Sequence, residues 1–268
     1  MKKMQPLAKW TVDSRANIKG VFADIDDTLT TDGRIPSNVY LAMERLREQG
    51  LLMIPITGRP AGWCDMIART WPVDGVVGEN GAMAFYYDAP SRRMRRLYMG
   101  SADVRVENRQ RLSAIRQDVL KSVRGVQVAA DQPYRETDLA IDFSEDVSGI
   151  PESAIDETLE IFKKHGATAK VSSIHVNGWF GTYDKLTMTK RLMSDVFDVA
   201  LDDDNSAWAY IGDSPNDAPM FRFFNNSVGV ANLRDLEDRC SDLPAWITPS
   251  ARSEGFIEMA NAILAAVK

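Results

Sequence analysis

The chain has 268 residues, of which 44% are hydrophobic and 26% are charged. These proportions are ordinary for a packed globular protein and argue against a disordered chain, and the length allows one large domain or two modest ones. The formal net charge of -6 disfavours sequence-independent binding of nucleic acid, which requires a dense basic surface. A small basic patch could still bind an anionic ligand.

Targeting and cysteine patterns indicate a soluble, cytoplasmic protein. The N-terminal segment has lysines but lacks the apolar stretch of a signal peptide, and no later segment approaches the roughly 18 apolar residues of a membrane span. Cys64 and Cys240 lie outside CxxC and Cys/His clusters, so we expect both to be buried as small apolar side chains. We expect neither a nucleic-acid nor a membrane partner, and either a monomer or a homodimer.

Strand and helix patterns alternate in the first third and in the last quarter of the chain. A short β-rich run, an amphipathic helix and a second run predict two parallel strands in one sheet. Pro36 gives a start signal for that helix and Gly50 a stop signal. The expected elements, in chain order, are strand 18–25, helix 36–50, strand 51–57, helix 60–71 and strand 75–82, and later strand 207–213, helix 216–224, strand 227–232 and helix 254–268.

The middle of the chain has a different pattern. A hairpin-like stretch at 83–100 is followed by the order helix, strand, strand, and that order then repeats. This predicts an α+β module with an antiparallel sheet. We place the module at residues 84–183, inserted into an α/β core formed by residues 1–83 and 184–268. After the hairpin-like stretch, the elements expected in the module are helix 103–123, strands 126–130 and 137–143, helix 151–166, and strands 168–173 and 174–180.

Acidic and hydroxyl side chains gather where three predicted strands end. Asp24 and Asp26 follow the first strand, Thr57 and Arg59 follow the second, and Asp213 begins the turn after a third. Two residues that lie two positions apart on an extended backbone point to the same side. Ligand sites in open parallel sheets favour the carboxyl ends of strands. The three clusters therefore predict one shared pocket.

Several other site types do not match this pattern. An EF-hand loop would need an acidic residue at position five and Gly at position six, where Thr28 and Leu29 stand. The chain contains no GxxxxGK[ST] phosphate loop, no GxGxxG fingerprint after a strand, and no GxSxG elbow. Each acidic cluster alone could be a polar strand cap, but the three together, in this order, favour a catalytic pocket.

The combined motifs resemble those of the haloacid dehalogenase-like superfamily. D-x-D-x-T stands at Asp24, Asp26 and Thr28, the Ser/Thr of the second motif at Thr57, and G-D-x-x-N-D at residues 212–217. The lone Lys of the third motif fits Lys185 best, with Lys190 as the fallback. The insert after Thr57 and the turn GENGA at 78–82 are similar to subfamily IIB, which includes sucrose-phosphate phosphatase, mannosyl-3-phosphoglycerate phosphatase and Cof-type phosphatases. That resemblance implies a Rossmann-like core with an αββαββ cap of C2B type.

The resemblance implies a Mg²⁺-dependent phosphatase for a small phosphorylated metabolite, such as a sugar phosphate, acting through an aspartyl-phosphate. Asp24 would be the nucleophile and Asp26 the general acid and base. Mg²⁺ would be held by Asp24, Asp213 and the Asp26 carbonyl, with Asp217 a ligand or an anchor. Thr57 and Lys185 would bind the transferring phosphoryl group. Further candidates for phosphate or substrate binding are Gly58, Arg59, Asn80, His175 and Asn216.

Some alternatives remain open at the level of sequence. Leu186 follows Lys185 where many relatives have Gly. The segment YDK is nearer to the WDK of phosphomannomutases, so a phosphosugar mutase is an alternative activity. A catalytically idle binding protein with the same fold is a second alternative, against which the intact motif set argues. His175 is equally compatible with a structural and a ligand-contacting role, whereas Trp179 is better interpreted as packing. We assign no catalytic role to Asp27, which stands where many relatives have Gly.

Overall fold

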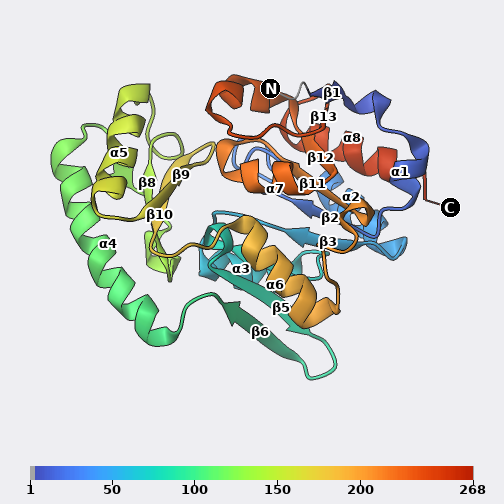
Figure 1. The fold of residues 1–268 in the computed structure, drawn as a ribbon, viewed down its shortest axis with the longest axis horizontal. Helices are drawn as coiled ribbons and strands as arrows, with labels where there is room; N and C mark the ends of the chain where they lie inside the picture. Colours follow the sequence, from blue (N-terminus) through green and yellow to red (C-terminus); the bar gives the residue numbers. More distant parts are fainter. Residues whose placement is uncertain (1–3, 268) are drawn as a thin grey trace.

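The computed structural model describes residues 4–267, so the first three residues and the last, which the predicted core includes, lie outside the described range. Two units lie side by side in Figure 1: a larger core with a parallel sheet, and a smaller unit in green and yellow in which helices cover an antiparallel sheet. We call the smaller unit, from α4 (Ala102–Ser122) to β10 (His175–Trp179), the cap. The predicted α/β class with an inserted α+β unit is confirmed.

The core sheet has six strands in the order β1-β13-β12-β11-β2-β3, and all neighbouring strands are parallel. Strands β2, β11 and β12 are buried along their whole length, as expected where helices cover both faces of a parallel sheet. The short outer strands β1 and β13 were not predicted. The strand bounds are β1 Gln5–Pro6, β2 Gly20–Ala23, β3 Leu52–Pro55, β11 Trp208–Gly212, β12 Asn226–Gly229 and β13 Trp246–Ile247.

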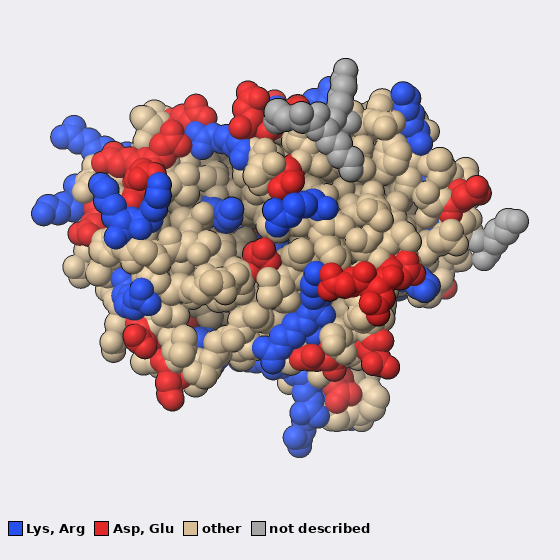
Figure 2. All heavy atoms as spheres, viewed as in Figure 1, with Lys and Arg blue, Asp and Glu red and all other residues tan. Residues whose placement is uncertain are grey.

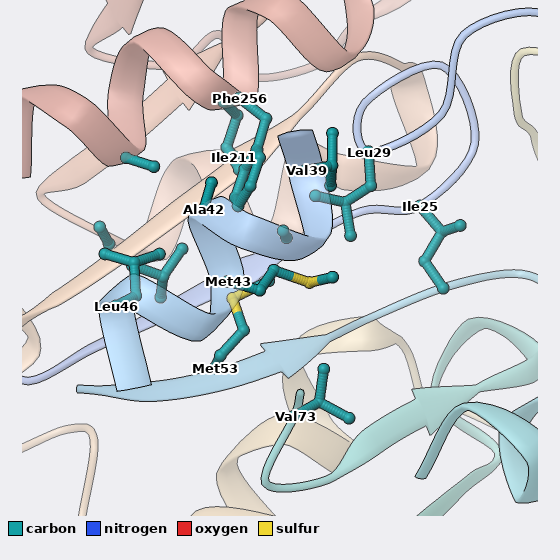
Figure 3. Close-up of a cluster of buried hydrophobic side chains, with 14 of the residues drawn as sticks. Ile25, Leu29, Val39, Ala42, Met43, Leu46, Met53, Val73, Ile211 and Phe256 are labelled. Carbon is teal, nitrogen blue, oxygen red and sulfur yellow. The ribbon is translucent and has the colours of Figure 1, made fainter. Parts of the chain in front are cut away.

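Helix α2 (Ser37–Glu48) shows how the sequence positions the core helices. It begins after Pro36 and ends before Gly50, as predicted. In Figure 3 its apolar face points toward Met53 of β3 and Phe256 of α8 (Arg252–Leu264). Burial of one such side chain contributes about 1.5–3 kcal/mol, so this face anchors the helix to the sheet. The buried residues of the face are the four expected ones, Val39, Ala42, Met43 and Leu46.

The other core helices lie between the strands in sequence. They are α1 (Val12–Ala16), α3 (Ala61–Thr70), α6 (Lys185–Phe197) and α7 (Ala218–Phe223). Short 3-10 helices complete the described connections: η1 Leu7–Lys9, η2 Glu79–Gly81, η3 Gln132–Tyr134, η4 Asn205–Ala207, η5 Pro215–Asp217 and η6 Ala231–Arg239. Two of them, η2 and η5, follow strands directly and carry predicted site residues.

The predicted hairpin belongs to the core and not to the inserted module. Strands β5 (Met83–Asp88) and β6 (Arg93–Tyr98) pair with each other, and β5 pairs with β4 (Val76–Gly78). A parallel bridge between Ile56 and Val77 links β4 to the end of β3. Pairing with β4 buries the start of β5 completely, which explains why the hairpin stays with the core. Within the range 84–183 predicted for the module, residues 84–98 thus form a sheet with β4, a strand that follows β3 of the core.

The cap repeats the order helix, strand, strand, as predicted. Its sheet has the order β7-β8-β10-β9, with antiparallel neighbours, and two helices pack on one face. Strand β10 alternates: Val176 and Gly178 lie against the helices, while His175 and Asn177 line a cavity shared with the core. The remaining cap elements are β7 Gln127–Val128, β8 Asp138–Asp142, α5 Glu152–Lys164 and β9 Thr168–Val171.

The surface agrees with the expectations from composition. On the face shown in Figure 2, Lys and Arg side chains are interspersed with Asp and Glu side chains. Cys64 and Cys240 are both buried and free, as predicted. Within residues 4–267, no helix combines the length and the apolar character that crossing a membrane would require.

Gly178 tests the packing of the cap. A Cβ at this position would overlap the ring of Phe162, which is fully buried in α5. We therefore expect Gly178→Ala to lower the free energy of unfolding by about 1–3 kcal/mol, measured by urea denaturation. Gly100→Ala is the control, because the nearest atom to its added Cβ would be Val104 Cγ1 at 3.6 Å, an ordinary van der Waals contact. Equal stability of the two variants would contradict the packing shown here.

Candidate active site

The predicted site residues meet because their strands are neighbours. Strands β11, β2 and β3 are adjacent and parallel, so their carboxyl ends lie along one edge of the sheet. Asp213 follows β11, Asp24 follows β2, and Thr57 follows β3 after one residue. All three side chains are buried. The structure thus brings the three strand-end clusters to one edge, as the sequence predicted.

Lys185 connects these clusters. It is the first residue of α6, and its side chain is 1% exposed. Nζ donates to Asp24 Oδ1 at 2.6 Å, to Asp217 Oδ1 at 2.6 Å and to Asn216 Oδ1 at 3.2 Å. Burial alone would lower the pKa of Lys185, but the two carboxylates outweigh burial and raise it. The fallback candidate Lys190 instead pairs with Asp202 at the surface.

Asp217 is an anchor in this arrangement. Oδ1 accepts from Lys185 and from the hydroxyl of Tyr210 at 2.5 Å, and Oδ2 accepts from the backbone N–H groups of Asp213 at 3.0 Å and Ser214 at 3.1 Å. Both oxygens are therefore occupied by donors. Of the two roles that the sequence left open for Asp217, these contacts match the anchor and not the metal ligand.

Asp24 and Asp213 carry buried charge that is only partly compensated. Burial raises the pKa of Asp24 well above its usual range, although Lys185 opposes the shift. Burial, followed by the charges of Asp24 and Asp217, raises the pKa of Asp213 in the same direction. Asp213 Oδ1 is buried and has no hydrogen-bond partner among the described residues. One ammonium thus faces three buried carboxylates, and a bound cation would offset the remainder.

A site with two carboxylates fits Mg²⁺, whereas a site with four carboxylates is not assembled. Mg²⁺ is commonly held by one or two carboxylates together with water and substrate oxygens, which Asp24 and Asp213 could supply. Across the part of the chain that the structure describes, no three His, Cys, Asp or Glu side chains converge as a metal-binding group. Direct ligation by the side chains of Asp26 and Asp217 as well is therefore not supported by the geometry.

Asp26 is held away from this buried group by Arg59. Arg59 Nε donates to Asp26 Oδ1 at 2.9 Å and to Oδ2 at 3.0 Å, and Arg59 Nη2 lies 2.8 Å from Oδ1. The guanidinium is 4% exposed and lies over the ring of Trp63. Such a forked contact fixes the orientation of a carboxylate. Asp24 and Asp26 therefore have different environments, the first beside an ammonium and the second beside a guanidinium.

Arg59 also joins the core to the cap. Its Nη2 lies 2.6 Å from Glu145 Oε1, and its Nη1 lies 3.4 Å from Asp131 Oδ2. In the opposite direction, Arg135 of the cap donates to the Gly58 carbonyl at 2.8 Å. A further tie runs from the buried carboxylate of Glu79 to the backbone N–H groups of residues 136 and 137, at 2.8 and 2.7 Å. The cap is closed over the carboxyl ends of the strands.

The closed cap leaves little room beside the buried carboxylates. A cavity of about 10 Å³ lies between Asp24, Asp26 and Asn216 of the core and His175 of the cap. This is space for roughly one water molecule. His175 Nε2 lies 3.0 Å from Glu145 Oε2, so His175 takes part in the junction between cap and core. Any larger ligand requires the cap to move or must extend into a neighbouring hollow.

Asn80 and Gly58, which the sequence also suggested for substrate binding, lie close to each other beside this cavity. Asn80 Oδ1 accepts from Asn216 Nδ2 at 3.2 Å, and Asn80 Nδ2 is buried without a partner among the described residues. Gly58 lines the cavity, and a Cβ there would lie 3.1 Å from Asn80 Nδ2. Trp179 is buried and stacks on Tyr183, which agrees with its interpretation as packing.

Asp27 occupies a backbone conformation that explains its place in the motif. Its φ is +55°, in the left-handed region where Gly is favoured and Asp is tolerated. Its carboxylate points to Arg252, with Oδ1 lying 3.1 Å from Nε. Asp27 therefore pairs with Arg252 and is not among the acceptors of Lys185.

Comparison with known proteins agrees with this geometry. Residues 21–104, which contain the first two motifs, match the family model of haloacid dehalogenase-like hydrolases. Over this segment, the match confirms the resemblance to the haloacid dehalogenase-like superfamily that the motifs indicated. A comparison with curated proteins finds no match.

Solved structures share the fold of this protein over nearly the whole chain. The sucrose-phosphatase of Synechocystis, solved with sucrose and phosphate, is 15% identical, covers 92% of this chain and 98% of its own, and has a TM-score of 0.64. The C-terminal domain of the C. albicans trehalose-6-phosphate phosphatase is 11% identical, with 98% and 99% coverage and a TM-score of 0.71. A subclass IIB sugar phosphatase is 15% identical, with 91% and 98% coverage and a TM-score of 0.63. These likenesses show that the chain has the same overall fold as these phosphatases.

The sequence did not predict the cap residues that contact the core. Glu145, Asp131 and Arg135 lie in cap loops whose distance along the chain from Arg59 gives no local signal. Tyr210 had a detectable signal, because it lies two residues before Gly212 on β11 and thus on the same side of the strand. Glu79 was part of the GENGA turn, but only its neighbour Asn80 was singled out.

The contact of Glu145 with Arg59 and His175 predicts a pH-dependent stability. Partial burial raises the pKa of Glu145, but His175 and Arg59 outweigh it and lower the pKa from 4.5 to about 2. The lowered pKa contributes stability that is present above pH 4.5 and is lost as the pH falls toward 2. We expect Glu145→Gln to lower the free energy of unfolding by about 1–3 kcal/mol at pH 7.

The difference between wild type and Glu145→Gln should shrink as the pH falls below 4.5, measured by urea denaturation between pH 7 and pH 3. Glu157→Gln on the exposed side of α5 is the matched control, and it should show no such trend. A stability difference that stays constant over this range would contradict the ion pair between cap and core.

Proposed function

We propose that this protein is a Mg²⁺-dependent phosphatase that hydrolyses a small phosphorylated metabolite, a sugar phosphate, through an aspartyl-phosphate intermediate. One observation carries the proposal: Asp24 lies buried at the end of a central strand, in contact with Lys185 and near Asp213. Asp213 Oδ1 has no hydrogen-bond partner among the described residues. This arrangement provides a nucleophile and a fixed ammonium. It also leaves buried negative charge that a divalent cation would offset. The match of residues 21–104 to the family model of haloacid dehalogenase-like hydrolases supports hydrolase chemistry.

The residues present fit Mg²⁺. Asp24 and Asp213 would hold the cation, with the backbone carbonyl of Asp26 as a further oxygen ligand and Asp217 as the anchor of the turn. Hard cations prefer such oxygen ligands. When bound, Mg²⁺ supplies charge neutralisation and alignment of the phosphoryl group. The excess of buried carboxylate over ammonium supports this assignment.

The two acidic residues of the first motif take different roles. In the first step, an Asp24 oxygen forms a bond to phosphorus, the bond from phosphorus to the leaving oxygen breaks, and Asp26 gives its proton to that oxygen. In the second step, water attacks the aspartyl-phosphate, Asp26 accepts a proton from the water, and Asp24 leaves as a carboxylate. The forked contact of Arg59 fixes the direction of the Asp26 carboxylate and favours its charged form, which is the form that accepts the proton in the second step.

Lys185 and Thr57 would stabilise the charge that develops on the transferring group. Fixed donors in a site that excludes water stabilise such charge more strongly than they would in water. Lys185 is held by three oxygen acceptors, so its position is set before a substrate binds. Asn216 accepts from Lys185 and donates to Asn80, which supports a role in orienting these groups.

Asp24→Asn tests the nucleophile. We expect the substitution to reduce kcat by at least about 10³-fold, because the amide cannot form the aspartyl-phosphate. Release of inorganic phosphate from a panel of sugar phosphates, with Mg²⁺ and without a bisphosphate activator, measures the activity and separates hydrolysis from the mutase reaction. Asp203→Asn in an exposed turn is the control and should retain wild-type activity. Substantial Mg²⁺-dependent turnover by Asp24→Asn would refute the assignment.

Asp213→Asn tests the metal site without relying on turnover. A cation at a hundred times its Kd stabilises a protein by about 2.7 kcal/mol, so Mg²⁺ should raise the Tm of the wild type by roughly 5–10 °C over that in EDTA. In Asp213→Asn this shift should disappear, while the Tm in EDTA stays equal to or above that of the wild type, because one buried unpaired carboxylate is removed. Retention of the full Mg²⁺ shift would exclude Asp213 as a ligand.

A further inference from the structure

A second hollow adjoins the candidate active site on the side of Asp26. It has a volume of about 360 Å³, at the lower end of the range for small-molecule pockets, and lies between the core and the cap. Its charged lining consists of Asp26, Asp27, Asp32, Arg59, Glu145 and Arg252. We call it the side hollow. Asp26 and Arg59 line both this hollow and the 10 Å³ cavity next to Asp24.

Its position matches that of a leaving group. The small cavity has space for roughly one water molecule, so a leaving group cannot lie there, and Asp26, the proposed proton donor to the leaving oxygen, lines both the cavity and the side hollow. The larger groove of about 590 Å³ between cap and core is lined by none of the side chains assigned to the chemistry. The rest of a substrate bound at Asp24 therefore fits best in the side hollow.

The charges of the side hollow restrict what it can accept. Arg59 already pairs with Asp26 at 2.8 Å and with Glu145 at 2.6 Å. Arg252 already pairs with Asp27 at 3.1 Å and with Asp32 at 2.7 Å. Four carboxylates in the lining face two guanidiniums; Arg59 has three acidic partners, two of which line the hollow, and Arg252 has two. A further anion would meet excess negative charge without a free cation, whereas hydroxyl groups can donate to the carboxylates.

We propose that the side hollow binds an uncharged leaving group rich in hydroxyls, and that Asp27 and Asp32 exclude leaving groups with a second anionic group. This inference rests on the proposed phosphatase activity and narrows its substrate class to monophosphates of neutral polyols and sugars. Asp27 and Asp32 both lie in the core, Asp27 within the first motif and Asp32 shortly after it. Arg252, which pairs with both, is the first residue of α8. Asp27, which has no role in the chemical steps, thereby acts in specificity.

The test compares kcat/KM within matched pairs of substrates that differ by one anionic group. Glucose 6-phosphate is paired with 6-phosphogluconate, and fructose 6-phosphate is paired with fructose 1,6-bisphosphate. We expect the wild type to prefer the neutral member of each pair at least tenfold, mainly through KM. In the double variant Asp27→Asn, Asp32→Asn the preference should fall at least threefold, because Arg252 is freed to bind the additional anion. Asp203→Asn, Asp235→Asn, which changes two exposed carboxylates elsewhere, should keep the wild-type preference.

The outcomes separate this inference from the function on which it rests. Hydrolysis with equal or greater kcat/KM for the anionic members would overturn the selection by the side hollow and leave the phosphatase assignment intact. An unchanged preference in the folded Asp27→Asn, Asp32→Asn variant, verified by its Tm, would do the same. Absence of hydrolysis of every phosphate ester, including p-nitrophenyl phosphate, would overturn the phosphatase assignment and the inference together.

Discussion

The contact of Lys185 with Asp24 and Asp217 is the interaction on which the site depends. These groups are buried, and they come from three distant parts of the chain. Removing a carboxylate from water is costly unless a cation or donors compensate for it, so the fold tolerates this group only because α6 places an ammonium among the strand ends. The compensation is incomplete, since Asp213 keeps a buried oxygen without a partner in the described part of the chain. That imbalance is the basis on which we propose that the site binds a divalent cation.

A second constraint is the guanidinium of Arg59, which ties the core to the cap. Its contacts with Asp26 and with Glu145 mean that the orientation of the proposed general acid depends on the closed position of the cap. Cap closure and proton transfer are thus linked through one side chain. The same contacts leave Arg59 without capacity for a further anion, which is why the side hollow suits a neutral leaving group.

Much of the core and of the site could be predicted because the signals are local. Alternating strand and helix patterns fix a parallel sheet, and parallel strands place their carboxyl ends together, so Asp24, Thr57 and Asp213 had to meet. The choice of Lys185 over Lys190 came from the family motif. The hairpin at 83–98 was recognised, but its pairing with β4 could not be predicted, because that pairing is decided by tertiary structure.

The sequence by itself determined the α/β core, the inserted αββ repeat and the identity of the acidic residues at the strand ends. Only the tertiary structure decided the partners of three acidic side chains. Asp217 accepts hydrogen bonds from the turn after β11, Asp26 pairs with Arg59, and Asp27 pairs with Arg252. The physical reason is the range of the interactions. Periodicity and turn chemistry act over a few residues, whereas the partner of a buried charge is selected across the whole fold by which groups burial brings within hydrogen-bond distance.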